Sequence, residues 1–169
     1  MDFRARLTAE IPYLRRFARG LAGDAALADD LVQDCMERAL VKEHLYDPSR
    51  PLRAWLYAVL RNIHISGLRR TGRARVAKSV EELAPDEEAV AGEQESQVAV
   101  RSIAEALDRL PDLHREVVLL IGLEDMSYRE AAEIVGVPVG TVMSRLSRAR
   151  AALRTMLEPG ERAGLRRVK

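Results

Sequence analysis

A short segment near the C-terminus, residues 127–157, constrains the fold more than any other feature of this sequence. Ser127 is a typical N-cap residue, and Glu130 three positions later completes a capping box, so a helix is predicted to begin here. Gly136 can adopt the left-handed conformation that ends a helix, and Pro138 can lie in the first turn of the next one. Two helices joined by so short a turn predict a helix-turn-helix.

The second of these helices has two distinct faces. One face is apolar and is predicted to dock on the rest of the domain; it carries Val142, Leu146, Ala149 and Leu153. The opposite face carries Thr141, Ser144, Arg145 and Arg148. Hydroxyl and guanidinium groups near a helix N-terminus suit base edges and phosphates in the major groove. An ordinary solvated face is the alternative, but residues 139–157 contain four arginines and no acidic residue, which favours DNA binding.

The remainder of the sequence is also predicted to be helical. Hydrophobic residues make up 47% of the chain but aromatic residues only 4%, so the core must be aliphatic, which favours packed helices over sheets. Apolar residues recur at helical spacing over residues 3–21, 25–45, 52–70 and 100–110. Pro12 is predicted to begin or kink the first helix. The sequence therefore predicts an all-α fold made of two small helical domains.

Charge is distributed unevenly, although the net charge is only +1. Every charged residue from 51 to 80 is basic, and every charged residue from 81 to 95 is acidic. With scattered glycine and proline and little apolar periodicity, this pattern predicts a flexible acidic linker, with a short helix possible at 80–83. The predicted domains are residues 1–72 and 98–169, with the linker at 73–97.

Several functional classes are not expected from the sequence. Cys35 is the only cysteine and lies within an apolar helical pattern, which favours a buried structural thiol. No metal-ligand spacing, nucleophile–base pair or phosphate loop is found, so neither an enzyme nor a cofactor is expected. A cytoplasmic location is expected, because no signal peptide and no membrane-spanning apolar run is found.

Four stretches of the sequence resemble bacterial sigma factors of the extracytoplasmic-function (ECF) group. They are ADDLVQDCMERAL at 28–40, LRAWLYAVLRNIHISGLRR at 52–70, LDRLPDLHREVVLL at 107–120 and MSYREAAEIVGVPVGTVMSRLSRARAALR at 126–154. The resemblance implies a transcription initiation factor that binds the β′ clamp and β flap of core RNA polymerase. Its C-terminal domain would read the upstream −35 promoter element, and its N-terminal domain would read and melt the −10 element.

The resemblance also implies roles for individual residues. Polymerase binding falls to an acidic strip of Asp30, Gln33 and Asp34, which suits a basic partner surface, although a solvated helix face would look the same. The −10 and melting residues would be Arg61, Asn62, Ser66, Arg69 and Arg70. The loop at 46–52 would help to hold an unstacked base. Ser66 stands where an aspartate is usual and Leu52 where a phenylalanine is usual, while Trp55 is predicted to lie in the core.

Regulation and an alternative function follow from the same resemblance. An anti-sigma factor is the expected inhibitor, and we expect the two domains to share no large apolar interface, so that this inhibitor could enter between them. The acidic linker is either a solubilising tether or a mimic of nucleic acid in the polymerase channel. The alternative function is a sigma-like decoy that binds an anti-sigma protein without promoting transcription.

Overall fold

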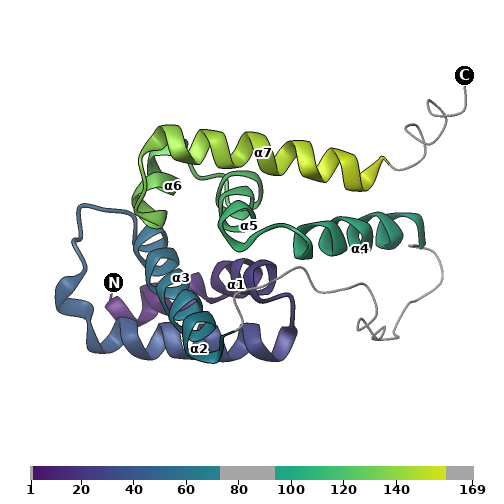
Figure 1. Cartoon of the computed structure of the whole chain (residues 1–169). Helices are drawn as coiled ribbons and strands as arrows, with labels where there is room; N and C mark the ends of the chain where they lie inside the picture. The colour runs from purple at the N-terminus through teal and green to yellow at the C-terminus, as the bar shows by residue number, and fades with distance from the viewer. Residues whose placement is uncertain (1, 73–93, 159–169) are drawn as a thin grey trace, which may run out of the picture.

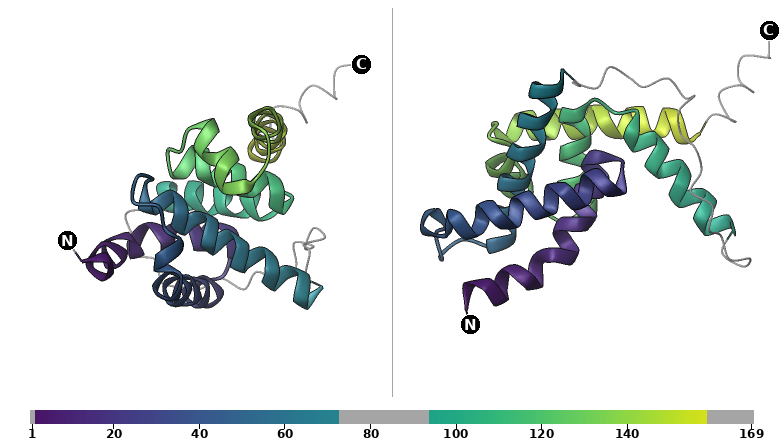
Figure 2. Two further views of the ribbon diagram at one scale, coloured as in Figure 1. Left: turned by 90° about the vertical axis from the view of Figure 1, so that its left-hand side faces the viewer. Right: turned by 90° about the horizontal axis from the view of Figure 1, so that it is seen from below.

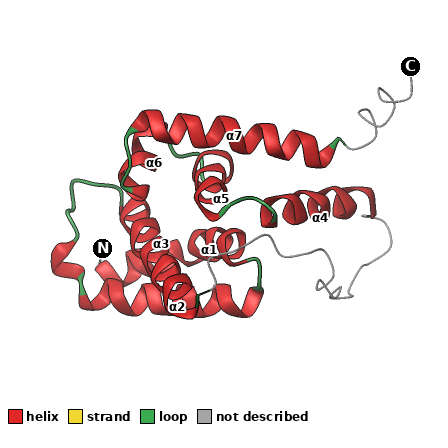
Figure 3. Cartoon of the chain, viewed as in Figure 1, coloured by secondary structure: helices red, strands yellow, loops and turns green. Residues whose placement is uncertain are grey.

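The computed structural model describes residues 2–72 and 94–158, and within them every regular element is a helix (Figure 1 and Figure 3). The N-terminal half, residues 2–72, contains α1 (Phe3–Ala22), α2 (Ala25–Val41), the 3₁₀ helix η1 (Glu43–Leu45) and α3 (Leu52–Thr71). The C-terminal half, residues 94–158, contains α4 (Gln94–Asp108), α5 (Asp112–Val118), the π-helical segment η3 (Leu119–Leu123), α6 (Tyr128–Val135) and α7 (Val139–Leu157). The predicted all-α class with two helical units is confirmed.

Some helix limits differ from the sequence-based expectation. α1 runs unbroken through Pro12, which removes one backbone donor without ending the helix. α2 ends at Val41, because the chain tightens into η1 instead of continuing to Leu45. α4 begins at Gln94, inside the range predicted as linker. The possible helix at 80–83 lies outside the described residues.

The core of the N-terminal half forms where α1, α2 and α3 meet. Phe17 and Tyr57 are fully buried, with ring centroids 4.7 Å apart. The buried stripe of α2 is Ala28, Val32, Cys35 and Ala39. Leu27 and Leu40 of the same helix are 50% and 41% exposed. Each lies one residue from the buried stripe, and about 100° of helical rotation turns it toward solvent.

The helix-turn-helix forms as its local signals predict. The Ser127 hydroxyl accepts a hydrogen bond from the Glu130 amide (3.1 Å), and the Glu130 carboxylate accepts one from the Ser127 amide (2.8 Å). Gly136 ends α6 with a left-handed φ of 77°. Pro138 is the N-cap residue of α7 and not part of its first turn. Local hydrogen bonds therefore define the start of α6, and the left-handed Gly136 defines its end.

The two halves pack against each other, so the expectation that they share no large apolar interface is wrong. Buried side chains of α1 and α3 form one continuous core with Val117, Leu119 and Leu120 of the C-terminal half, and Figure 2 shows the two groups of helices side by side. At Gly20 a Cβ atom would lie 2.6 Å from a methyl carbon of Leu119, so a larger residue there would force the Leu119 side chain or the helices to shift. The π-helical segment that follows is closed by the Glu124 amide, which donates to the Leu119 carbonyl (3.0 Å).

Candidate nucleic-acid and polymerase interfaces

The polar face of α7 is the candidate DNA-reading surface. Val142, Leu146 and Ala149 are buried against the C-terminal half, as predicted, which turns the opposite face outward. Ser144 and Arg148 are exposed, and Thr141 is half-buried. Arg145 differs from them, since only 19% of its side chain is exposed. The helix lies along one side of the molecule and is not covered by the N-terminal half (Figure 1).

The predicted −10 residues lie along α3. Asn62, Ser66, Arg69 and Arg70 are exposed, and the two arginines occupy the last turn of the helix. Cations at a helix C-terminus are stabilised by the helix dipole, and they are free to contact phosphates. Arg61 is set apart, because only 15% of its side chain is exposed. The predicted residues of α3 therefore do not form one open surface.

The predicted reading residues that the structure brings together are Arg61 and Arg145, and they meet at Glu116. The Arg61 Nε donates to Oε2 of Glu116 at 2.7 Å, and its Nη2 donates to Oε1 at 3.2 Å. The Arg145 Nη1 lies 3.8 Å from the same Oε1. Burial raises the pKa of Glu116, and the hydrogen bond and charge of Arg61 offset part of that effect. Glu116 was not predicted from the sequence. The charged pair of Arg115 and Glu116, directly before the apolar run 117–121, could have indicated buried charges there.

A second buried carboxylate, Glu124, also joins the two halves. The Arg16 guanidinium donates to both of its oxygens at 2.8 Å, and the Tyr57 hydroxyl donates to Oε2. Burial and the neighbouring Glu124 raise the pKa of Tyr57 well above its ordinary value. A third polar contact has its donor in the C-terminal half: Nη1 of the fully buried Arg115 donates to the carbonyl of Leu21 in α1 (3.2 Å). Polar contacts thus accompany the apolar packing between the halves.

The predicted polymerase-binding strip is open. Asp30, Gln33 and Asp34 are all exposed on the side of α2 opposite its buried stripe. The Gln33 amide donates to Glu37 at 3.1 Å, which extends the strip by one further carboxylate. In Figure 1, α2 lies on the side of the molecule away from α7. The strip can therefore be reached by a partner while the two halves remain packed.

The loop before α3, predicted to help hold an unstacked base, is anchored by Tyr46. The Tyr46 hydroxyl accepts from Arg6 (2.9 Å) and donates to the Arg50 carbonyl (2.8 Å). Its ring packs on Trp55 with centroids 5.4 Å apart. Trp55 is partly buried and packs against the core, which agrees with its predicted place. A hydrogen bond from the Ser49 amide lowers the pKa of Asp47 and fixes the turn.

The structure also places the predicted structural thiol. Cys35 is fully buried, its Sγ contacts the Leu56 carbonyl at 3.5 Å, and burial raises its pKa to about 12. The thiolate is the reactive form, so we expect maleimide to label the native protein at pH 8 at least about a hundredfold more slowly than the urea-unfolded protein. Comparable labelling rates in the two states would contradict this burial.

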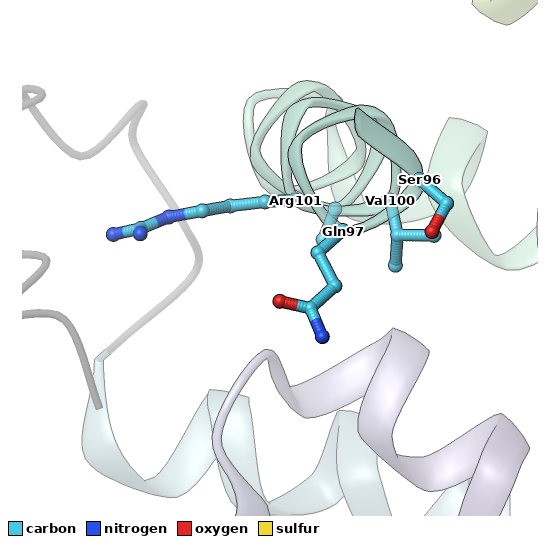
Figure 4. A pocket seen from close by; sticks show the side chains of 5 residues that line it. Ser96, Gln97, Val100 and Arg101 are labelled. Atoms are coloured by element: carbon cyan, nitrogen blue, oxygen red, sulfur yellow. The ribbon is translucent and has the colours of Figure 1, made fainter. Parts of the chain in front are cut away.

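Within residues 2–72 and 94–158, no group of three or more His, Cys, Asp or Glu side chains could hold a metal ion. A shallow hollow of about 260 Å³ lies on α4, lined by Ser96, Gln97, Val100, Arg101 and Ala104 (Figure 4). Residues 2–72 and 94–158 also include no helix long and apolar enough to cross a membrane. The α3, α7 and α2 surfaces remain the candidate functional regions.

Comparison with known proteins relates both halves to one class. Residues 7–61 match the protein-family model described as the Sigma2 domain of PhyR, and residues 101–153 match Sigma-70, region 4. The chain is 39% identical over 159 residues to the ECF RNA polymerase sigma factor EcfG of Rhodopseudomonas palustris, covering 92% of this chain and 85% of the relative.

Solved structures give the same relationship. The sigma factor RpoE of Bartonella quintana, in complex with the anti-sigma factor NepR, matches with a TM-score of 0.75 and 32% identity, covering 95% of this chain and 99% of that one. The anti-anti-sigma factor PhyR from Bartonella quintana, complexed with NepR, shares the fold at a TM-score of 0.58 and 19% identity. The match covers 88% of this chain and 49% of the PhyR chain.

Proposed function

This chain belongs to the extracytoplasmic-function (ECF) family of RNA polymerase sigma factors, and from that premise we propose that it directs core polymerase to specific promoters. The observation that carries the proposal is the polar face of α7, with Ser144 and Arg148 exposed at the outer side of a capped helix-turn-helix. We assign the −35 element to Thr141, Ser144, Arg145 and Arg148. Such a helix presents its N-terminal residues to base edges in the major groove.

The −10 element is assigned to α3. The exposed amide of Asn62 has both a donor and an acceptor, so it can read the edge of an unstacked base. Ser66 lies one turn further along, and Arg69 and Arg70 supply positive charge for the phosphates. Arg61 completes the set once it leaves Glu116. Promoter melting would then use a face of the N-terminal half that is already mostly open.

An in vitro transcription assay tests this function directly. Core polymerase with the purified chain should initiate specifically on the promoter region upstream of the chain's own gene, whereas core polymerase alone should not. Failure to initiate on that DNA and on a randomised promoter library would refute the proposal.

Polymerase docking is predicted to depend on the acidic strip of α2. Reversing Asp30 and Asp34 to lysine should weaken core binding at least about tenfold, because like charges across an interface cost free energy. Both side chains are exposed, so the fold should not change. Pull-down with core polymerase and circular dichroism measure the two effects. Reversing Glu133 and Glu158, exposed carboxylates of the C-terminal half, is the matched control, and undiminished binding of the Asp30/Asp34 variant would refute the assignment.

A decoy is the second candidate function, and one comparison favours it. The model that matches residues 7–61 describes a domain of PhyR, and PhyR is described as an anti-anti-sigma factor. A decoy needs no DNA-reading face, yet Ser144 and Arg148 are exposed here. A decoy would bind an anti-sigma protein but fail the transcription assay, so the same experiment separates the two functions.

Control by an anti-sigma factor fits the comparisons, since the RpoE match was solved with its anti-sigma factor bound. The packed halves change how such an inhibitor would act on this chain. An inhibitor that enters between the halves must displace contacts such as Gly20 with Leu119. One that binds outside them would hold the packed arrangement in place. We propose that inhibition of this chain acts through this packing.

A further inference from the structure

Two arginines assigned to different promoter elements share one buried carboxylate in the packed chain. Arg61 belongs to α3 in the N-terminal half, while Glu116 of α5 and Arg145 of α7 belong to the C-terminal half. The Glu116 side chain is only 3% exposed. We call this three-residue arrangement the Glu116 contact. Its side chains join α3 to α5 and α7.

The Glu116 contact withdraws these two arginines selectively. Their neighbours Asn62 and Ser144 are exposed, so neither α3 nor α7 is covered as a whole. A guanidinium that is mostly buried beside a carboxylate cannot at the same time contact a phosphate or a guanine edge. The packed chain therefore presents an incomplete DNA-reading surface on both helices.

The two arginines are not held equally well. Arg61 makes two charge-assisted hydrogen bonds with Glu116, at 2.7 and 3.2 Å, and these are strong contacts. Arg145 lies 3.8 Å away, beyond hydrogen-bond distance, and its buried Nη1 finds no hydrogen-bond acceptor within the described part of the chain. A buried donor without an acceptor is unfavourable. Arg145 would therefore gain from exchanging Glu116 for a DNA acceptor.

We propose that the Glu116 contact is autoinhibitory: in the free chain it keeps Arg61 and Arg145 from promoter DNA, and separation of the halves frees both. This inference rests on the proposed function, which assigns those arginines to DNA. Separation moves Arg61 away from Glu116 because they lie in different halves. It also exposes Glu116 to water, where an ion pair at 3.8 Å contributes little, so Arg145 is released as well.

The test measures the affinity of the free chain for a promoter fragment carrying both elements, by fluorescence anisotropy without polymerase. Glu116→Gln keeps the shape of the side chain and removes its charge, so it should bind the fragment at least about tenfold more tightly than the wild type. Glu105→Gln is the matched control, since it removes a partly exposed carboxylate that pairs with Arg101 within α4 and does not join the halves. That control should bind within about twofold of the wild type.

A second variant opens the interface without changing charge. A side chain at Gly20 would overlap the Leu119 methyl groups, so Gly20→Val should also tighten DNA binding. Gly67→Val, where an added Cβ meets no atom within 4 Å, is its control. Circular dichroism checks that each variant is folded. If Gly20→Val does not fold, the affinity of Glu116→Gln for the promoter fragment alone decides whether the Glu116 contact is autoinhibitory.

The outcomes separate the two proposals. If Glu116→Gln binds DNA no better than the wild type while both support transcription with core polymerase, the autoinhibitory contact is refuted and the proposed function stands. If Glu116→Gln and Glu105→Gln tighten binding equally, the effect is general electrostatics and the contact is again refuted. If no form binds the fragment or supports transcription, the proposed function is refuted together with the inference built on it.

Discussion

Replacing both Arg145 and Arg148 with alanine is expected to reduce −35-dependent transcription at least about thirtyfold, since each base-contacting arginine contributes roughly 1–3 kcal/mol. Arg148 is exposed in the packed chain, and Arg145 joins it when Glu116 no longer holds its guanidinium. The measurement is in vitro transcription from a promoter that carries both elements. Alanine at Arg150 and Arg154, exposed arginines further along α7, is the matched control.

The single variants at these two positions distinguish the kinds of contact. An arginine that reads a base should, when replaced, relax specificity at one or two promoter positions, while one that contacts a phosphate should weaken binding to all sequences alike. Selection from a randomised −35 library measures this difference. Unchanged transcription by the double alanine variant would show that α7 does not dock on DNA through this face.

Replacing Glu124 with alanine is expected to lower the free energy of unfolding by about 3 kcal/mol. Its carboxylate is buried and accepts hydrogen bonds from Arg16 and Tyr57, both in the other half. Arg16 is about half exposed and can regain water, but the buried Tyr57 hydroxyl loses its acceptor. Urea denaturation followed by circular dichroism measures the loss.

Tyr57→Phe is the matched control for Glu124→Ala. It removes one donor and leaves the Arg16 pair intact, so it should cost about 1 kcal/mol. If Glu124→Ala and Tyr57→Phe lower the free energy of unfolding equally, the ion pair of Arg16 with Glu124 does not contribute to stability. If the halves unfold separately in the Glu124→Ala variant, the denaturation curve should show two transitions where the wild type shows one.

Local signals in the sequence were sufficient for the helix-turn-helix. The capping box of Ser127 and Glu130 and the left-handed Gly136 depend on residues within one turn, so the sequence shows them directly. The apolar face of α7 was likewise predicted correctly. Composition and periodicity also gave the all-α class, because an aliphatic core with few aromatic residues favours packed helices.

The packing of the two halves could not be predicted in the same way. Glu116 and Glu124 look like surface residues in the sequence, and their partners Arg61 and Arg16 lie 55 and 108 positions away. The π-helical segment Leu119–Leu123 departs from a helical repeat of 3.6 residues, so apolar periodicity does not predict it. Gly20 lies within α1 and makes room for Leu119, a role that the apolar spacing of residues 3–21 does not indicate. The packing of the two halves therefore depends on pairs of residues far apart in the sequence, which local patterns do not predict.

The absence of a side chain at Gly20 has a consequence for the fraction of molecules whose halves separate. A partner that needs the opened chain binds with an apparent affinity reduced by the fraction of molecules that are open. An added Cβ at position 20 would force Leu119 to shift, so we expect substitution there to raise the open fraction while leaving unchanged every residue assigned to DNA or polymerase. Alanine or serine at position 20 is then expected to raise the cellular activity at the same protein concentration. The expected increase is the same at every promoter, because no base-reading residue changes.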